Sequence, residues 1–130
     1  MTAVTKAAVP ILAAVAVTAG GTKASPAAGG AGAWIDVAAY NGGLLGGRIK
    51  NAAGAVGAPG QMTWQWTPDP NPSTGSARIY DLFTWGGDVA SGSEYTISVR
   101  LDKEARFVRA LCYGNTTNPV TFESDLAASS

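Results

Sequence analysis

The chain has 130 residues, the size of a single domain with one hydrophobic core. Nine Lys and Arg residues balance nine Asp and Glu residues, and only 14% of all residues are charged, against about a quarter in an average soluble domain. This composition gives no basic surface for nucleic acid, and it is consistent both with a protein buried in an assembly and with a small monomeric domain.

The N-terminal third begins with an apolar run, residues 7–19, that follows Lys6. Together with the Ala-Gly-Ala sequence at 31–33, it has the outline of a secretory signal peptide. Three features weigh against a signal: the single lysine, the early position of Pro10, and the apolar β-branched residues of the run, which share the parity of odd-numbered positions from 9 to 17. This parity predicts a strand, and the run is shorter than the roughly 20 residues of a membrane-spanning helix. We therefore expect the N-terminus not to be cleaved.

Residues 1–30 are predicted to form an N-terminal arm and its linker. The odd-numbered residues of the arm supply the strand pattern, and glycine and alanine dominate residues 20–30, a composition typical of a flexible connection. An isolated strand invites pairing with another chain. We therefore expect the arm to lie on a neighbouring subunit and the rest of the chain to fold without it.

Residues 31–130 are predicted to form one β-sandwich domain. Apolar and polar residues alternate in several short segments, and Gly, Pro and Asn residues separate these segments. The predicted strands cover residues 34–40, 44–50, 61–67, 77–85, 95–101, 106–113 and 120–126. The pattern is typical of an all-β fold, an antiparallel β-sandwich or jelly-roll-like domain, here with an extended N-terminal arm.

Several details of these strands can be predicted. The glycine pair Gly46-Gly47 is expected at a bulge or at a close approach of two backbones. Turn residues at 114–119 predict that the last two strands form an antiparallel hairpin. The positions expected to face the core are Ile35, Val37, Ala39, Ile97, Val99, Val108, Ala110, Cys112, Val120 and Phe122.

Catalytic and metal-binding residues are scarce. The sequence has no histidine and one cysteine, which excludes Ser-His-Asp and Cys-His catalytic sites, an internal disulfide, and histidine-dependent or cysteine-rich metal centres. A pair of carboxylates could serve a glycosidase, but the sequence brings no two of them together. The candidates are Asp36, Asp81, Asp88, Glu94, Glu123 and Asp125. We therefore expect a protein that is not an enzyme and that needs no cofactor or metal.

Aromatic residues offer a second candidate site. Trp64 and Trp66 share one face of a predicted strand. Such a stripe could stack on carbohydrate, but tryptophans at this spacing more often fill a core or an interface because each buries a large apolar area. We expect Trp64 and Trp66 in the core. The other aromatic candidates, on different strands, are Trp34, Tyr80, Trp85 and Tyr113.

Arginines gather near the C-terminal strands. The cluster consists of Arg100, Arg106 and Arg109, with Asp102 and Glu104 between them in the sequence. This mixture of signs favours ion pairs over a phosphate-binding surface.

Three sequence motifs resemble those of small β-sandwich structural proteins of tailed-bacteriophage virions. The first is A-W-I-D-V-A-A-Y at 33–40. The second combines Q-M-T-W-Q-W-T-P-D with I-Y-D-L-F-T-W-G-G-D, and the third, the most specific, joins F-V-R-A to Y-G-N-T-T-N-P-V-T-F-E. The resemblance covers roughly residues 31–126, although the long Ala/Gly-rich arm departs from the family pattern.

The resemblance implies a role without catalysis. It suggests a capsid decoration (cement) protein, or a small head or tail component, that is present in many copies. The implied partners are the major capsid protein or neighbouring head or tail subunits and further copies of this chain, with no direct contact to nucleic acid or membrane. The implied location is the virion, assembled in the cytoplasm of the host bacterium.

Two functions of other classes stay open. A secreted carbohydrate-binding module would need a cleaved N-terminus and exposed aromatic residues such as Trp64 and Trp66. A small hydrolase would need two carboxylates that face each other across a cleft.

Overall fold

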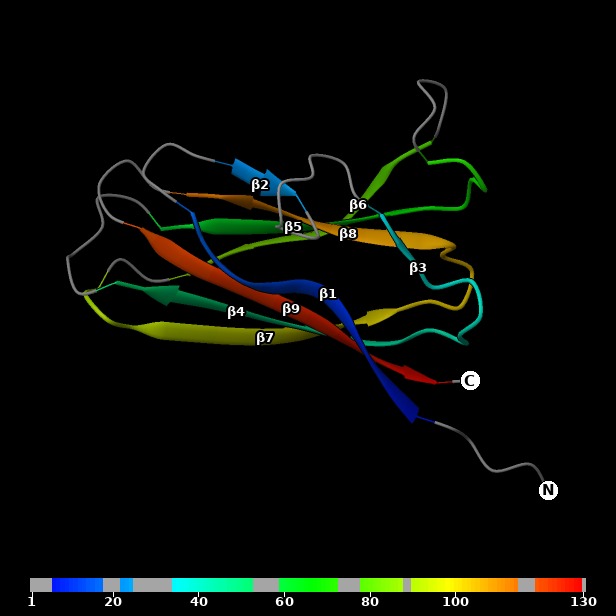
Figure 1. Cartoon of the computed structure of the whole chain (residues 1–130), viewed down its shortest axis with the longest axis horizontal. Coiled ribbons are helices and arrows are strands. Elements are labelled where there is room, and N and C mark those ends of the chain that lie inside the picture. Colours follow the sequence, from blue (N-terminus) through cyan, green and yellow to red (C-terminus); the bar gives the residue numbers. More distant parts are fainter. Residues whose placement is uncertain are drawn as a thin grey trace.

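The computed structural model describes residues 6–17, 22–24, 34–52, 59–72, 78–87, 90–114 and 119–129. Within these ranges the chain forms two antiparallel β-sheets that pack face to face, and the predicted all-β sandwich is confirmed (Figure 1). The strands are β1 (Lys6–Val17), β2 (Thr22–Ala24), β3 (Ile35–Asp36), β4 (Gly43–Asn51), β5 (Gln61–Thr67), β6 (Tyr80–Gly86), β7 (Glu94–Leu101), β8 (Phe107–Tyr113) and β9 (Val120–Ser129).

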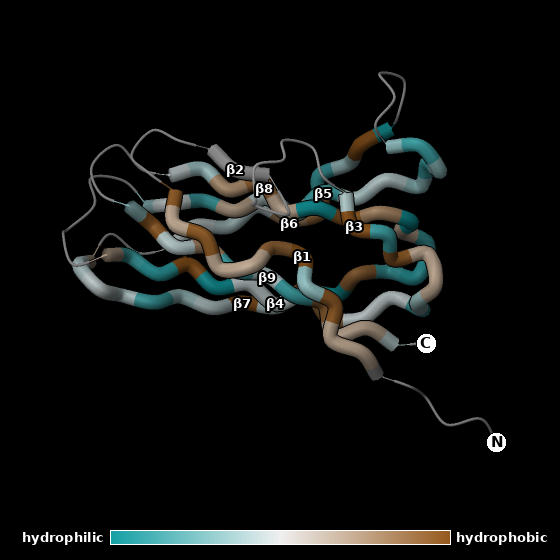
Figure 2. The backbone as a smooth tube through the Cα atoms, in the orientation of Figure 1, coloured by the Kyte–Doolittle hydropathy of each residue, from teal (hydrophilic) through white to brown (hydrophobic). Residues whose placement is uncertain are grey.

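The two sheets have simple orders. The first sheet runs β1-β9-β4-β7, and the second runs β2-β8-β5-β6. The short strand β3 pairs with the start of β8, and β2 pairs with its end, while β5 pairs with β8 along its whole length. Hydrophobic and hydrophilic positions alternate along the strands (Figure 2), as expected when one face of each sheet is buried.

The predicted hairpin of the last two strands is wrong. β8 belongs to the second sheet and β9 to the first, so the chain crosses from one sheet to the other between them. Val108, Ala110, Cys112, Val120 and Phe122 are all fully buried, as predicted. Alternation identifies the apolar face of a strand but not the strand that supplies its hydrogen bonds, so both arrangements satisfy the same pattern.

The N-terminal strand is present, but it lies in its own domain and not on a neighbour. β1 pairs with β9 of the same chain, from Lys6 opposite Ser129 to Val17 opposite Val120. Its apolar side chains complete the core: Ile11, Leu12 and Val17 are almost completely buried. The other edge of β9 is occupied by β4, so β1 covers a strand edge and an apolar face that would otherwise be open.

Two irregularities explain how β1 fits there. The register with β9 shifts between Pro10 and Leu12, and again between Leu12 and Val15. The first shift allows both Ile11 and Leu12, which are adjacent in sequence, to be buried. Pro10 is tolerated because β1 is the last strand of its sheet and Pro10 lies beside this shift. Most of the predicted linker at 20–30 lies outside the described residues, and residues 22–24 form β2.

The predicted strand at 34–40 is much shorter in the structure. Only β3 is extended, and residues 38–40 form a turn. Oδ1 of Asp36 accepts a hydrogen bond from the backbone N–H of Ala38 at 2.9 Å, and such a local bond favours a turn over further extension. Val37, just before the turn, is buried as predicted. Ala39 lies in the turn and is exposed, so the prediction that it faces the core is wrong.

The centre of the core is built from tryptophans that pack on a glycine. Trp64 of β5 is fully buried, and its ring lies 5.7 Å from that of Trp85 in β6. A Cβ atom built on Gly47 of β4 would lie 2.6 Å from Cζ2 of Trp85 and 2.8 Å from Cζ2 of Trp64. The prediction of a bulge or of a close approach of two backbones at this glycine pair is wrong. The pairing of β4 with β7 and β9 is regular there, and the two tryptophan rings occupy the space of a side chain at Gly47.

The substitution Gly47→Ala is expected to lower the free energy of unfolding by about 1–3 kcal/mol, the usual cost of overpacking a filled core. Gly46→Ala is the matched control, because a Cβ atom there would contact only Oδ1 of Asp125, at 3.2 Å. We expect this variant to be close to wild type. Urea denaturation of both proteins provides the measurement, and equal stabilities would mean that the tryptophan rings do not pack on Gly47.

Candidate functional site

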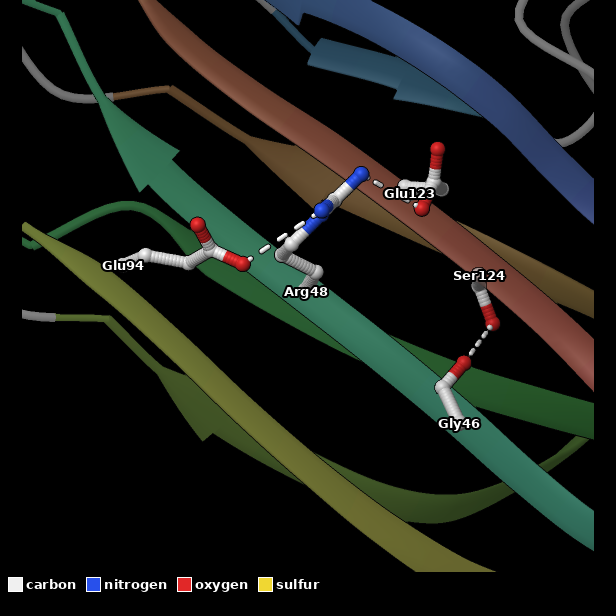
Figure 3. Close-up of polar contacts among 5 residues, drawn as sticks. All are labelled: Gly46, Arg48, Glu94, Glu123 and Ser124. Carbon is white, nitrogen blue, oxygen red and sulfur yellow. Dashed lines mark hydrogen bonds and ion pairs between the residues drawn. The ribbon is translucent and has the colours of Figure 1, made fainter.

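The outer face of the first sheet carries an arginine between two glutamates (Figure 3). Arg48 of β4 lies between β7 and β9 in the sheet. Its Nη2 lies 2.8 Å from Oε1 of Glu123 in β9, and its Nη1 lies 3.4 Å from Oε1 of Glu94 in β7. The three side chains line an open depression of about 300 Å³ together with Asp125.

This arrangement suits a cross-strand ion pair better than acid–base chemistry. Two of the candidate carboxylates, Glu94 and Glu123, are brought together, but the Arg48 guanidinium lies between them. All three side chains are exposed by 40% or more, whereas a catalytic acid is usually kept protonated by burial or by a second carboxylate. The ion pairs join β7, β4 and β9, and their contribution to stability is small because they face solvent.

The remaining carboxylate candidates have other roles. Asp36 caps the turn after β3, and Asp81 accepts a hydrogen bond from Gln65 at 2.7 Å. Asp88 lies outside the described residues. In the described part of the chain, His, Cys, Asp and Glu side chains do not gather in a group of three that could hold a metal ion. In the same part, no helix is long and apolar enough to cross a membrane.

The outer face of the second sheet carries a row of polar side chains beside a tryptophan. Nε of Arg109 donates a hydrogen bond to Oε1 of Gln65 at 2.8 Å, and Nε2 of Gln65 donates to Oδ1 of Asp81 at 2.7 Å. The guanidinium of Arg109 also lies over the ring of Trp34, 4.4 Å from its centroid. Partial burial lowers the pKa of Arg109, and Tyr113 opposes this shift.

The arginine cluster of the sequence is therefore not one site. Arg109 makes a hydrogen bond and a cation–π contact in place of the predicted ion pair. Among the described residues, the ion pairs are those of Arg48, a residue that sequence reasoning missed. The signal for it was the position of Arg48 between Gly47 and Ile49, because strand alternation places its charge on the face opposite to these two residues.

The two tryptophans of β5 have different environments. Trp64 is in the core, as predicted, and its Nε1 donates a hydrogen bond at 2.9 Å to Oγ of the buried Ser124. Ser124 in turn donates to the carbonyl oxygen of Gly46 at 2.9 Å (Figure 3). The two bonds join Trp64 of the second sheet to β9 and β4 of the first. Trp66 is only partly buried and stacks on Tyr80, with 5.1 Å between the ring centroids.

Large apolar side chains are exposed along the edges of the sandwich. Ile79, Tyr80 and Phe83 lie in or just before β6, the last strand of the second sheet, and each is at least 40% exposed. Tyr95 lies in β7, the last strand of the first sheet, and the centroid of its ring lies 5.9 Å from that of Trp85. We call Ile79, Tyr80 and Phe83 the β6 edge patch. Exposed apolar side chains on an edge strand are typical of a surface that can bind another protein.

Cys112 is an inert core residue in the structure. Its side chain is fully buried in β8, and this burial raises the pKa of its thiol strongly. The prediction of a small buried hydrophobe is confirmed, because a reactive cysteine needs an accessible thiolate.

The buried thiol makes stability depend on alkaline pH. In the unfolded chain the thiol ionises near pH 8.5, but in the folded protein it stays protonated well above that pH. We therefore expect the free energy of unfolding to fall as pH rises above about 8.5. Denaturation of wild type and of Cys112→Ala between neutral and alkaline pH measures the effect, which the variant should lack. A wild-type thiol that reacts rapidly with a thiol reagent in the folded protein would contradict this expectation.

No protein-family model and no curated protein sequence matches the chain. Solved structures that are similar to the chain have low sequence identity to it. The K3 cleaved adhesin domain of Lys-gingipain from Porphyromonas gingivalis is 16% identical, with a TM-score of 0.49 over 75% of this chain and 59% of that one. This chain therefore spans about six tenths of that adhesin domain.

Two further solved structures are similar in the same way. A family 16 carbohydrate-binding module is 8% identical, with a TM-score of 0.46 over 88% of this chain and 74% of that one. The top component of cowpea mosaic virus, a naturally occurring empty particle, is 12% identical, with a TM-score of 0.41 over 94% of this chain and 85% of that one. The similar structures thus come from an adhesin, a carbohydrate-binding module and a viral capsid.

Proposed function

We propose that the protein is a structural component of a bacteriophage virion, without catalytic activity and present in many copies. More specifically, we propose a capsid decoration protein that binds the major capsid protein or neighbouring head or tail subunits. It would be assembled in the host cytoplasm, would contact neither nucleic acid nor membrane directly, and would act without a cofactor.

The observation that carries the proposal is the β6 edge patch. Ile79, Tyr80 and Phe83 are 40%, 45% and 44% exposed beside a strand edge that no described strand covers. A partner that covered this patch would bury about half of each side chain and could add its own strand to β6. The low and balanced charge of the chain supports the same role, because it opposes neither close packing nor contact between copies.

The test is the content of purified particles. If the proposal is right, particles from the native source contain the chain in many copies, and Tyr80→Ser combined with Phe83→Ser removes it from them. Tyr113→Ser is the matched control, since Tyr113 is 41% exposed but lies in β8, away from the patch. Circular dichroism must show that both variants are folded. A chain absent from particles, or a patch variant that still incorporates, would refute the proposal.

A secreted carbohydrate-binding module is the second candidate. The outer face of the second sheet supports it, because Trp34 offers an aromatic ring beside the hydrogen-bonded row of Arg109, Gln65 and Asp81. Sugar recognition commonly combines an aromatic surface with directed polar groups. The buried Trp64 takes no part in this version. A glycan array with wild type and Trp34→Ala tests it: binding that the variant loses would favour the module over the virion component.

A further inference from the structure

The outer edge of the first sheet is formed by β7. This strand pairs with β4 on one side, and in the described part of the chain no strand pairs with its other side (Figure 1). The unpaired side of this eight-residue strand presents the backbone N–H and C=O groups of alternate residues, a row that another strand can extend. Tyr95, at this edge, is 48% exposed.

The register with β4 determines the face of each β7 side chain. The β7 residues that lie opposite the inward-facing Leu45, Gly47 and Ile49 point toward the core. The β7 residues that lie opposite the even-numbered residues of β4, from Leu44 to Lys50, point outward. The inner face of β7 carries Tyr95, Ile97 and Val99. The outer face carries Glu94, Thr96, Ser98 and Arg100, which are all exposed.

We propose that two copies of this chain bind each other through β7, antiparallel about a two-fold axis at Ile97. In that register Glu94 of each copy lies opposite Arg100 of the other, so that two pairs of opposite charge flank the axis. On the inner face Tyr95 lies opposite Val99, which covers the exposed ring, and Ile97 lies opposite its own copy. The first sheets of the two copies become one continuous sheet.

The charges favour this register over its neighbours. A shift that moves the axis to Ser98 places Glu94 opposite Asp102, which is a repulsive pair, and a shift to Thr96 leaves Arg100 opposite Gly92. An in-register parallel arrangement sets Glu94 against Glu94. Opposite charges directly across a strand pair stabilise it and like charges destabilise it. The spacing of Glu94 and Arg100 about Ile97 therefore selects one antiparallel pairing.

Contacts within the monomer leave Glu94 available. Its link to Arg48 is 3.4 Å long, whereas the bond from Arg48 to Glu123 is 2.8 Å long. Arg48 thus has its main partner in β9, and Glu94, with 40% of its side chain exposed, can face Arg100 of a second copy. This self-contact rests on the proposed structural function and deepens it, because it names the surface through which the copies meet.

Charge reversal tests the contact. Sedimentation equilibrium of wild type should show a dimer that dissociates on dilution. Arg100→Glu and Glu94→Arg each replace two attractive pairs by two repulsive ones, so each should raise the dimer dissociation constant by at least about tenfold. The double variant restores opposite charges across the axis and should return most of the affinity.

The controls separate the interface from net charge and from folding. Arg106→Glu and Glu104→Arg make the same charge changes at exposed positions outside β7 and should dimerise like wild type. The double variant also retains the unfavourable neighbour that Glu94→Arg gives Arg48, so its recovery excludes an effect within the monomer. A wild-type protein that stays monomeric up to about 1 mM, or a double variant that does not recover, overturns the proposal.

A cross-link reports the register independently. In the proposed dimer the two copies of residue 97 lie directly opposite, within the Cα separation that a disulfide spans. Folded Ile97→Cys should therefore form a cross-linked dimer under mild oxidation, and Thr96→Cys, which lies opposite Ser98, should form much less. Equal cross-linking of both variants overturns the register.

The proposed function and the dimer can fail separately. Charge-reversal variants that are monomeric and still enter particles would leave the structural function in place but show that it does not use β7. A dimer of a chain that is absent from particles would retain the self-contact and refute the virion role.

Discussion

A chain that lacks residues 1–17 is expected not to fold. β1 supplies three almost completely buried side chains, Ile11, Leu12 and Val17. Burial of each contributes about 1.5–3 kcal/mol, so their loss removes about 5–9 kcal/mol from a domain whose total stability is about 5–15 kcal/mol. The truncation also exposes the inner face of β9, including Phe122 opposite Val15. Near-ultraviolet circular dichroism and thermal unfolding of the truncated protein measure the effect.

A peptide of residues 6–17 is expected to restore the fold when it is added to the truncated chain. It can pair with β9 and insert the same side chains, as a strand donated from outside does in other sheets. A control peptide with Ile11→Asp should not, because it would bury an unpaired charge. Cooperative unfolding of the truncated chain alone would contradict the structure. It would favour the sequence-based prediction that the N-terminal segment lies on a neighbouring subunit.

Phe122→Ala is expected to lower the free energy of unfolding by about 3–5 kcal/mol, the range for a large aromatic residue in a filled core. Phe122 is fully buried in the core. A Cβ atom built on Gly60 would lie 2.9 Å from Cζ of the Phe122 ring, so the ring packs directly on that backbone. Removal of the ring leaves a cavity between the two sheets.

Phe83→Ala is the matched control for this experiment. It removes the same side chain from an edge strand where 44% of it is exposed, and we expect a loss of less than about 1 kcal/mol. Urea denaturation of both variants, with the slopes compared, gives the two values. Losses of similar size would mean that Phe122 is not the core residue that the structure describes.

Much of the fold was predictable from the sequence because strand alternation is a local property. Val108, Ala110 and Cys112 alternate with larger and more polar residues, and they are buried as predicted. The same alternation predicted the strand at β1. Two register shifts interrupt it there, between Pro10 and Leu12 and between Leu12 and Val15, so Leu12 is buried as well as Ile11 and Val17. Ile97 and Val99 face inward but are only partly buried, because an edge strand is covered from one side alone.

The candidate surfaces were less predictable because they combine distant residues. Arg48, Glu94 and Glu123 come from three strands, and Arg109 reaches Gln65 and Trp34 across the second sheet. No spacing in the sequence connects these positions. They meet because the order of strands in each sheet places them side by side.

The sequence by itself determined the all-β class, the turn positions and the inward face of most strands, since these depend on neighbouring residues along one chain. Only the tertiary structure decided which strands pair. It placed β8 and β9 in different sheets, although each has the pattern of a hairpin strand, and it returned β1 to its own core. The physical reason is that any apolar face can be buried against any other, and the pairing depends on which edges and faces the rest of the chain leaves open.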